Sequence, residues 1–130
     1  MIDIPNLAEI LVMHELLLET FGGMRGITEQ GFGKIEAAIA APHQSIFGED
    51  LYPDLPAKAT ALFFGLARAH GFSDGNKRVA LVALIDMLSR NGYQLACDDD
   101  TLYQGVMNSA DSGTRATAEE WIRSYLVKAA

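Results

Sequence analysis

Nine consecutive residues, from His70 to Arg78, carry most of the side chains that can do chemistry. They read His-Gly-Phe-Ser-Asp-Gly-Asn-Lys-Arg. An apolar run from Val79 to Leu88 follows at once, so this cluster stands where a helix is expected to begin. The N-terminus of a helix presents free backbone N–H groups and the positive end of the helix dipole, and both attract anions. The sequence therefore predicts an anion site, with phosphate chemistry as the candidate reaction.

Two residues of the cluster are candidates for proton transfer and metal binding. A histidine can accept a proton from a hydroxyl group near neutral pH, which makes His70 the candidate general base. Asp74 is the only acid among these nine residues. One carboxylate together with nucleotide phosphates is a common way to hold Mg²⁺. Asp74 is therefore the candidate metal ligand.

The rest of the cluster is suited to binding phosphate oxygens. Gly75 can adopt a turn in which backbone N–H groups face an anion. The side chains that follow it offer three kinds of donor: the amide of Asn76, the point charge of Lys77 and the planar fork of Arg78. Phe72 is the only large apolar side chain within the cluster. We expect it to anchor the loop in the core.

Each of these residues also has a simpler interpretation. A histidine at a helix end often only caps the helix, an aspartate before a helix is a frequent N-cap, and lysines and arginines are mostly solvated surface charges. The simpler interpretation explains the group less well, because cations in the first turn of a helix oppose its dipole by about 0.3–1 kcal/mol each. Neither a P-loop motif nor a protein-kinase catalytic loop occurs in the sequence. The residues by themselves thus indicate an anion site and leave the reaction open.

The composition predicts a single domain spanning residues 1–130. The chain is long enough for one core, and its 49% hydrophobic and 21% charged residues are ordinary for a soluble protein. A net charge of −7 argues against direct nucleic-acid binding, which needs a basic face. The single cysteine, Cys97, can form no intrachain disulfide, and no segment resembles a signal peptide or a membrane span. We therefore expect a cytoplasmic protein with no membrane contact.

Helical periodicity dominates the sequence, which predicts an all-α fold. Apolar residues spaced by three and four run from Leu7 to Phe21, after an apparent capping box of Asn6 and Glu9. Two later runs, Ala57–Ala69 and Val79–Leu88, have little or no polar face, so we expect them to be central, buried helices that flank the polar cluster. The further helices are expected near Gln30–Ala40, Ala57–Ala69, Val79–Leu88, Asp98–Asn108 and Thr117–Leu126.

Other segments carry weaker signals. His43 to Pro56 contains two prolines and a glycine and is expected to be a loop, and Tyr93 to Ala96 is expected to be a short extended piece. Thr117 to Glu120 resembles a capping box that would open the last helix. His14 falls on the apolar stripe of the first helix. We interpret it as a core histidine with satisfied ring nitrogens, and a supporting role beside the site is the alternative.

The nine-residue cluster resembles the signature of the Fic/Doc (Fido) superfamily, and within it that of the Doc (death-on-curing) toxins. The Fic signature reads His-Pro-Phe-x-Asp/Glu-Gly-Asn-Gly-Arg, and Doc-type chains have a lysine at its second glycine, as this chain has Lys77. Gly71 replaces the proline of Fic, and Gly75 matches the first glycine of Fic. The glycine-containing segment from Phe21 to Pro42 also resembles the amino-terminal part of Doc-type chains.

The resemblance implies a compact helical Fido fold and an enzyme that uses ATP and Mg²⁺. Doc toxins move the γ-phosphate of ATP to a threonine of elongation factor Tu and are inhibited by an antitoxin protein, whereas Fic proteins transfer AMP to a target hydroxyl. A Doc-like toxin kinase is the leading expectation; AMP transfer and a non-catalytic module that binds an anion or a peptide are the alternatives. By resemblance, His70 and Lys77 act in catalysis, Asp74 binds the metal, Gly75, Asn76, Lys77 and Arg78 bind phosphate, and Phe72 and His14 support the loop.

Overall fold

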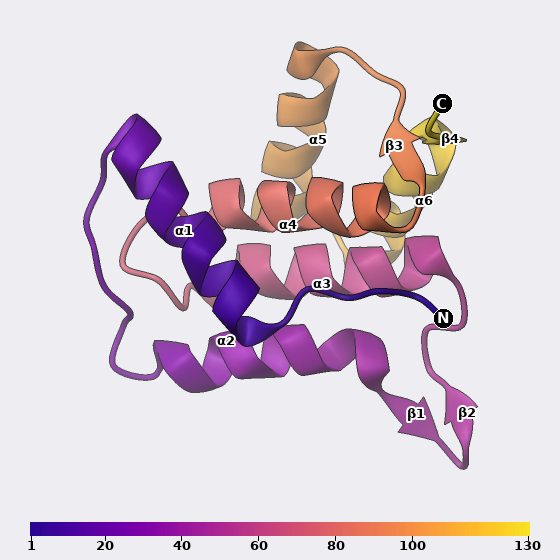
Figure 1. Cartoon of the computed structure of the whole chain (residues 1–130), viewed down its shortest axis with the longest axis horizontal. Coiled ribbons are helices and arrows are strands. Elements are labelled where there is room, and N and C mark those ends of the chain that lie inside the picture. Colours follow the sequence, from indigo (N-terminus) through magenta and orange to yellow (C-terminus); the bar gives the residue numbers. More distant parts are fainter.

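The computed structural model describes residues 1–130 and is built around two long helices. Helix α3 (Leu55–Ala69) and helix α4 (Asn76–Arg90) lie side by side and run in opposite directions (Figure 1). The loop of residues 70–75 connects them at one end. Most of the largest fully buried side chains come from this pair, which confirms that two central buried helices flank the polar cluster. They include Leu62, Phe63, Leu66, Val79, Leu84, Met87 and Leu88.

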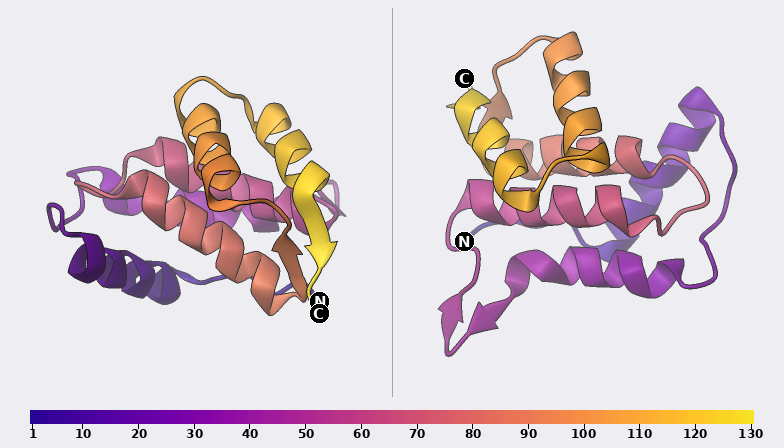
Figure 2. Two further views of the ribbon diagram at one scale, coloured as in Figure 1. Left: turned by 90° about the horizontal axis from the view of Figure 1, so that it is seen from above. Right: turned by 180° about the vertical axis from the view of Figure 1, so that it is seen from behind.

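The remaining helices cover this pair from several sides (Figure 2). Helix α1 (Leu7–Phe21) crosses α4, and helix α2 (Gly31–Ala40) packs on α3 and continues into the short 3₁₀ helix η1 (Ala41–His43). Helix α6 (Arg115–Tyr125) packs on α3. Helix α5 (Asp99–Asp111) contacts both α3 and α4. No helix is long and apolar enough to cross a bilayer.

Local capping explains where several helices begin. The predicted capping box of α1 is present: Asn6 Oδ1 accepts from Glu9 N at 2.9 Å, and Glu9 Oε1 accepts from Asn6 N at 3.1 Å. Helix α3 begins at Leu55, two residues before the expected start, because Asp54 accepts a hydrogen bond from Ala57 N at 3.0 Å. Helix α4 begins directly after Gly75, whose φ is +81°.

The C-terminal region corrects two sequence-based boundaries. The capping box of α6 joins Thr114 and Thr117, so the helix begins at Arg115 and the predicted box at Thr117 to Glu120 is wrong. The helix ends at Tyr125 because β4 (Leu126–Lys128) pairs antiparallel with β3 (Tyr93–Leu95). This pairing joins segments more than thirty residues apart, so local periodicity does not reveal it.

The predicted loop from His43 to Pro56 contains a small hairpin. Strand β1 (Ser45–Ile46) pairs antiparallel with β2 (Glu49–Asp50). The buried side chain of Lys58, on α3, donates from Nζ to Pro42 O at 3.0 Å and to Asp50 Oδ2 at 3.3 Å. It therefore ties both ends of the hairpin to the core. All four strands are only two or three residues long, and the all-α class predicted from the sequence is confirmed.

Candidate active site

A pocket of about 580 Å³ opens where the loop of residues 70–75 joins α3 to α4. It brings together every residue of the polar cluster to which the sequence assigned catalysis, metal binding or phosphate binding. Those lining residues are His70, Asp74, Gly75, Asn76, Lys77 and Arg78. The other walls come from Phe21, Gly22, Gly23, Ala67, Ser73, Tyr103 and Met107. The predicted site residues thus share one solvent-accessible hollow.

Left-handed backbone and close packing shape the start of this loop, directly after α3. His70 ends α3 with φ +50°, a conformation that only a few per cent of non-glycine residues adopt. Gly71 packs so closely that a Cβ there would lie 2.5 Å from Ile35 Cγ1, and its carbonyl accepts from Thr28 N at 2.9 Å. A proline has no room at position 71. Tight packing against α2 therefore explains the departure from the Fic signature.

The side chain of Asn76 fastens the loop to itself. Its Oδ1 accepts from Phe72 N at 3.0 Å, and its Nδ2 donates to Phe72 O at 2.9 Å. Phe72 is only 3% exposed and also forms a β-bridge with Ile27. The amide of Asn76 thus holds the buried anchor of the loop, while its role as a phosphate ligand stays a prediction.

His14 supports the loop from helix α1. Its Nε2 donates to Asp74 O at 2.7 Å, since a carbonyl oxygen can only accept. Its ring stacks on Phe72 with centroids 3.8 Å apart and an interplanar angle of 17°. The side chain is buried and its Nε2 has a partner, so His14 is a buried histidine that also supports the loop lining the pocket. The two interpretations of His14 describe the same contacts.

The carboxylate of Asp74 is oriented by backbone N–H groups. Oδ1 accepts from Gly75 N at 2.9 Å and Oδ2 accepts from Met24 N at 3.1 Å. A Cβ at Gly23 would lie 2.7 Å from Oδ2, so the glycine is needed for this close approach. Asp74 does not cap α4, because Gly75 is the N-cap residue. The contact with Met24 was not predicted, since nothing in the local pattern of residues 22–26 indicates its partner.

Asp74 fits a Mg²⁺ ion that is shared with a nucleotide. No group of three or more histidine, cysteine, aspartate or glutamate side chains gathers in the molecule to form a protein-only metal cage. A carboxylate has about four lone-pair positions, of which two are taken by the N–H groups of Met24 and Gly75. The other positions remain available on a residue that lines the pocket. This donor set fits an ion that takes its other ligands from phosphates and water.

The two cations of the first turn of α4 have partners from distant helices. Lys77 Nζ donates to Asp111 Oδ1 at 2.7 Å, and the guanidinium carbon of Arg78 lies 4.9 Å from the centre of the Phe21 ring. Sequence reasoning did not assign Asp111, Phe21 or the pocket-lining residues of α5 to the site. The spacing 103, 107, 111 places three α5 residues on one face, but which face meets the pocket depends on tertiary packing.

Comparison with known proteins gives the family of this fold and loop. Residues 4–88 match the model of the Fic/DOC family. The chain belongs to the Fic/DOC family. Its six helices and very short strands form the compact helical Fido fold that the motif led us to expect. The matched range includes the whole loop and nearly all of α4, whereas α5 and α6 lie outside it.

Two relatives place the chain close to the Doc toxins. It is 45% identical over 80 residues to Toxin Doc of Mycolicibacterium smegmatis, a match that covers 62% of this chain and 60% of that protein. Less than two thirds of that relative is therefore matched. The chain is 32% identical over 87 residues to Protein kinase doc of Escherichia phage P1, covering 67% of each protein. The family resemblance read from residues 70–78 is confirmed.

Proposed function

We propose that this chain is a Doc-like toxin that transfers the γ-phosphoryl group of ATP to a hydroxyl of a translation protein, with elongation factor Tu as the first candidate target. The observation that carries this proposal is that His70, Asp74 and Lys77 line one pocket at the N-terminus of α4. The similarity to Toxin Doc and to Protein kinase doc supports it. A target in translation makes the cytoplasm the place of action.

The groups that line the pocket suit this transfer. His70 takes the proton of the target hydroxyl as its oxygen attacks the γ-phosphorus, and the bond from that phosphorus to the bridging oxygen of ADP breaks. Lys77, Arg78 and the free N–H groups of the first turn of α4 stabilise the charge on the phosphoryl oxygens and on the leaving ADP. A Mg²⁺ ion held by Asp74 supplies further neutralisation of the phosphates.

An antitoxin protein is the proposed partner that inhibits this activity. The support is the similarity to a protein named Toxin Doc. Co-expression of the chain with the product of a neighbouring small gene tests this part of the proposal. Growth inhibition by the chain alone, relieved by that product, is the expected result.

Intact-mass analysis tests the transferred group. The purified chain is incubated with ATP, Mg²⁺ and a cell lysate, and we expect one protein to gain about 80 Da, the mass of a phosphoryl group. A gain of about 329 Da would instead show AMP transfer. If no protein gains mass and the chain captures the same partner with and without nucleotide, it is a binding module and the proposal is wrong.

The His70→Asn variant tests the base, because asparagine tolerates the left-handed backbone of this position. We expect transfer to fall by about 10²–10⁴-fold, while ATP binding persists, since this is the usual contribution of a general base. His43→Asn is the matched control, because His43 is exposed on η1 and outside the pocket. Full activity of His70→Asn with purified target would contradict the assignment.

A further inference from the structure

One face of α5 forms a wall of the pocket. Tyr103 and Met107 line the hollow, and Asp111, one further turn along the same face, accepts a hydrogen bond from Lys77 Nζ at 2.7 Å. Residues 103, 107 and 111 of this face, of which the first two line the pocket, lie outside the range matched by the family model. The family match therefore says nothing about what Asp111 does.

Lys77 and Asp111 both stand at helix ends that disfavour their charge. Lys77 is in the first turn of α4, beside the positive end of that helix dipole, and Asp111 is the last residue of α5, at the negative end of its dipole. Each unfavourable charge is compensated by the other. The carboxylate of Asp111 thus binds the ammonium group of Lys77, a residue that lines the pocket at the N-terminus of α4.

We propose that Asp111 competes with the nucleotide phosphates for Lys77 and thereby sets the affinity of the site for polyphosphate anions. This inference rests on the proposed function, in which the pocket binds a nucleotide. When phosphate enters, the ammonium group donates to its oxygens and the Asp111 carboxylate turns to water. The side chain of Asp111 is already 56% exposed, so little packing opposes this movement.

Binding measurements on an Asp111→Asn variant test the competition without requiring group transfer. The purified full-length chain is titrated calorimetrically with three probes: ATP with Mg²⁺, inorganic triphosphate and adenosine. We expect the variant to bind ATP and triphosphate about two- to fivefold more tightly, as loss of a competing exposed ion pair implies. Adenosine, which carries no phosphate, should bind equally to both proteins. The gain should shrink as the salt concentration rises.

Two controls separate competition at Lys77 from a general effect of charge. Glu120→Gln removes the same charge from an exposed residue of α6 that forms no ion pair, and it should bind triphosphate as the unaltered chain does. In a Lys77→Met background, Asp111→Asn should no longer change triphosphate binding, because the competition acts through the ammonium group. Thermal unfolding of each variant checks that the fold is retained.

Several results would overturn the inference. The first is an Asp111→Asn variant that binds triphosphate no more tightly than the unaltered chain. The second is a gain in triphosphate affinity on Asp111→Asn that is the same in the Lys77→Met background. The third is an equal gain in triphosphate affinity in the Glu120→Gln variant. Weaker binding by Asp111→Asn would show that the carboxylate holds Lys77 in its binding position. Failure of the proposed function is a separate result. If binding changes as expected but no lysate protein gains mass, phosphoryl transfer is refuted, whereas the competition between Asp111 and phosphate for Lys77 is still supported.

Discussion

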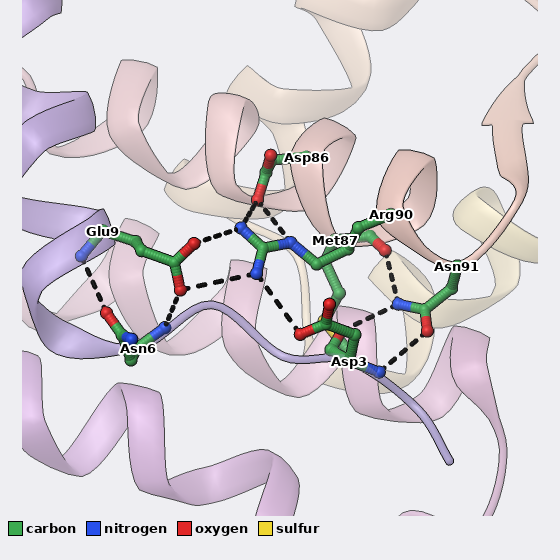
Figure 3. Close-up of polar contacts among 7 residues, drawn as sticks. All are labelled: Asp3, Asn6, Glu9, Asp86, Met87, Arg90 and Asn91. Atoms are coloured by element: carbon green, nitrogen blue, oxygen red, sulfur yellow. Dashed lines mark hydrogen bonds and ion pairs between the residues drawn. The ribbon is translucent and has the colours of Figure 1, made fainter.

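Both ends of α4 carry positively charged side chains, but the two ends satisfy those charges in different ways. At the C-terminal end, Arg90 donates to the carboxylates of Asp3, Glu9 and Asp86 (Figure 3). A cation there also agrees with the negative end of the helix dipole. The arginine side chain is 20% exposed, and hydrogen bonds to Glu9 and Asp86 raise its pKa above the ordinary value. The chain itself satisfies this charge completely.

The N-terminal end of α4 carries charges of the sign that the helix dipole disfavours there. Lys77 and Arg78 oppose the dipole, and their partners are one carboxylate, that of Asp111, and one aromatic ring, that of Phe21. Both cations also line an open pocket. A charge that the fold satisfies serves stability, whereas a charge left facing a pocket is available to a ligand. The contrast supports a structural role for the C-terminal end of α4 and agrees with the ligand site proposed at its N-terminal end.

The C-terminal end of α4, which we call its structural end, nevertheless contributes to the site at a distance. Asp3 N donates to Asn91 Oδ1 at 2.8 Å, and Asn91 Nδ2 donates to Asp3 O at 2.7 Å (Figure 3). Together with the ion pair of Arg90 and Glu9, these bonds fasten the N-terminal segment and the start of α1 to α4. His14, which supports the loop of the site, lies five residues beyond Glu9 on α1. Fixing α1 at its start therefore helps to place His14.

The Arg90→Met variant tests the structural end and should have the largest effect on stability. It leaves three carboxylates without their shared cation, so we expect the free energy of unfolding to fall by about 2 kcal/mol. Urea denaturation measures this loss. Arg25→Met is the matched control, because the ion pair of Arg25 with Glu15 is exposed and should contribute little. Equal losses in the two variants would remove the distinction between the ends of α4.

The His14→Leu variant tests how the structural end reaches the site. The loss of the bond to the Asp74 carbonyl should lower the free energy of unfolding by about 1 kcal/mol. It should also reduce kcat with purified target, because the loop that carries Asp74 loses its support. His14→Gln retains an N–H donor and should recover part of both quantities. A Leu variant with full kcat would show that His14 is only a core residue.

The smallest expected effect concerns the dependence of stability on pH. The hydrogen bond from Arg90, followed by the bond from the Asn6 backbone, lowers the pKa of Glu9 below its ordinary value of 4.5. A lowered pKa in the folded state means that Glu9 stabilises the fold above pH 4.5 and that this contribution is lost as the pH falls through the lowered value. Glu9→Gln should therefore flatten the loss of stability on acidification, measured by thermal unfolding at several pH values.

The matched control for the pH measurement is Glu36→Gln, an exposed residue of α2 without an ion pair. It should leave the pH profile unchanged. If Glu9→Gln has the same profile as the unaltered chain, the carboxylate of Glu9 is not held ionised by Arg90. Asp3 and Asp86 would then be the carboxylates that stabilise Arg90 at the C-terminal end of α4.

Several features of the fold were predictable because their causes are local. The helix periodicity, the capping box of Asn6 and Glu9 and the turn at Gly75 each depend on residues a few positions apart. The gathering of His70 to Arg78 at one helix start has the same origin. The start of α6 was predicted wrongly because a threonine hydroxyl, that of Thr117, completes the capping box in place of an acid. Residues 114–117 and residues 117–120 each offer a capping pattern, and the sequence pattern favoured the second.

The amino-acid sequence by itself determined the helical class, the family signature and the candidate site residues, because side-chain spacing within one or two turns encodes them. Tertiary structure alone decided which distant groups meet that loop. Met24 N binds the Asp74 carboxylate, and Asp111 binds Lys77, although 50 and 34 positions separate the partners. Such contacts arise when helices pack, and packing depends on the shape of the whole core rather than on any local run of residues.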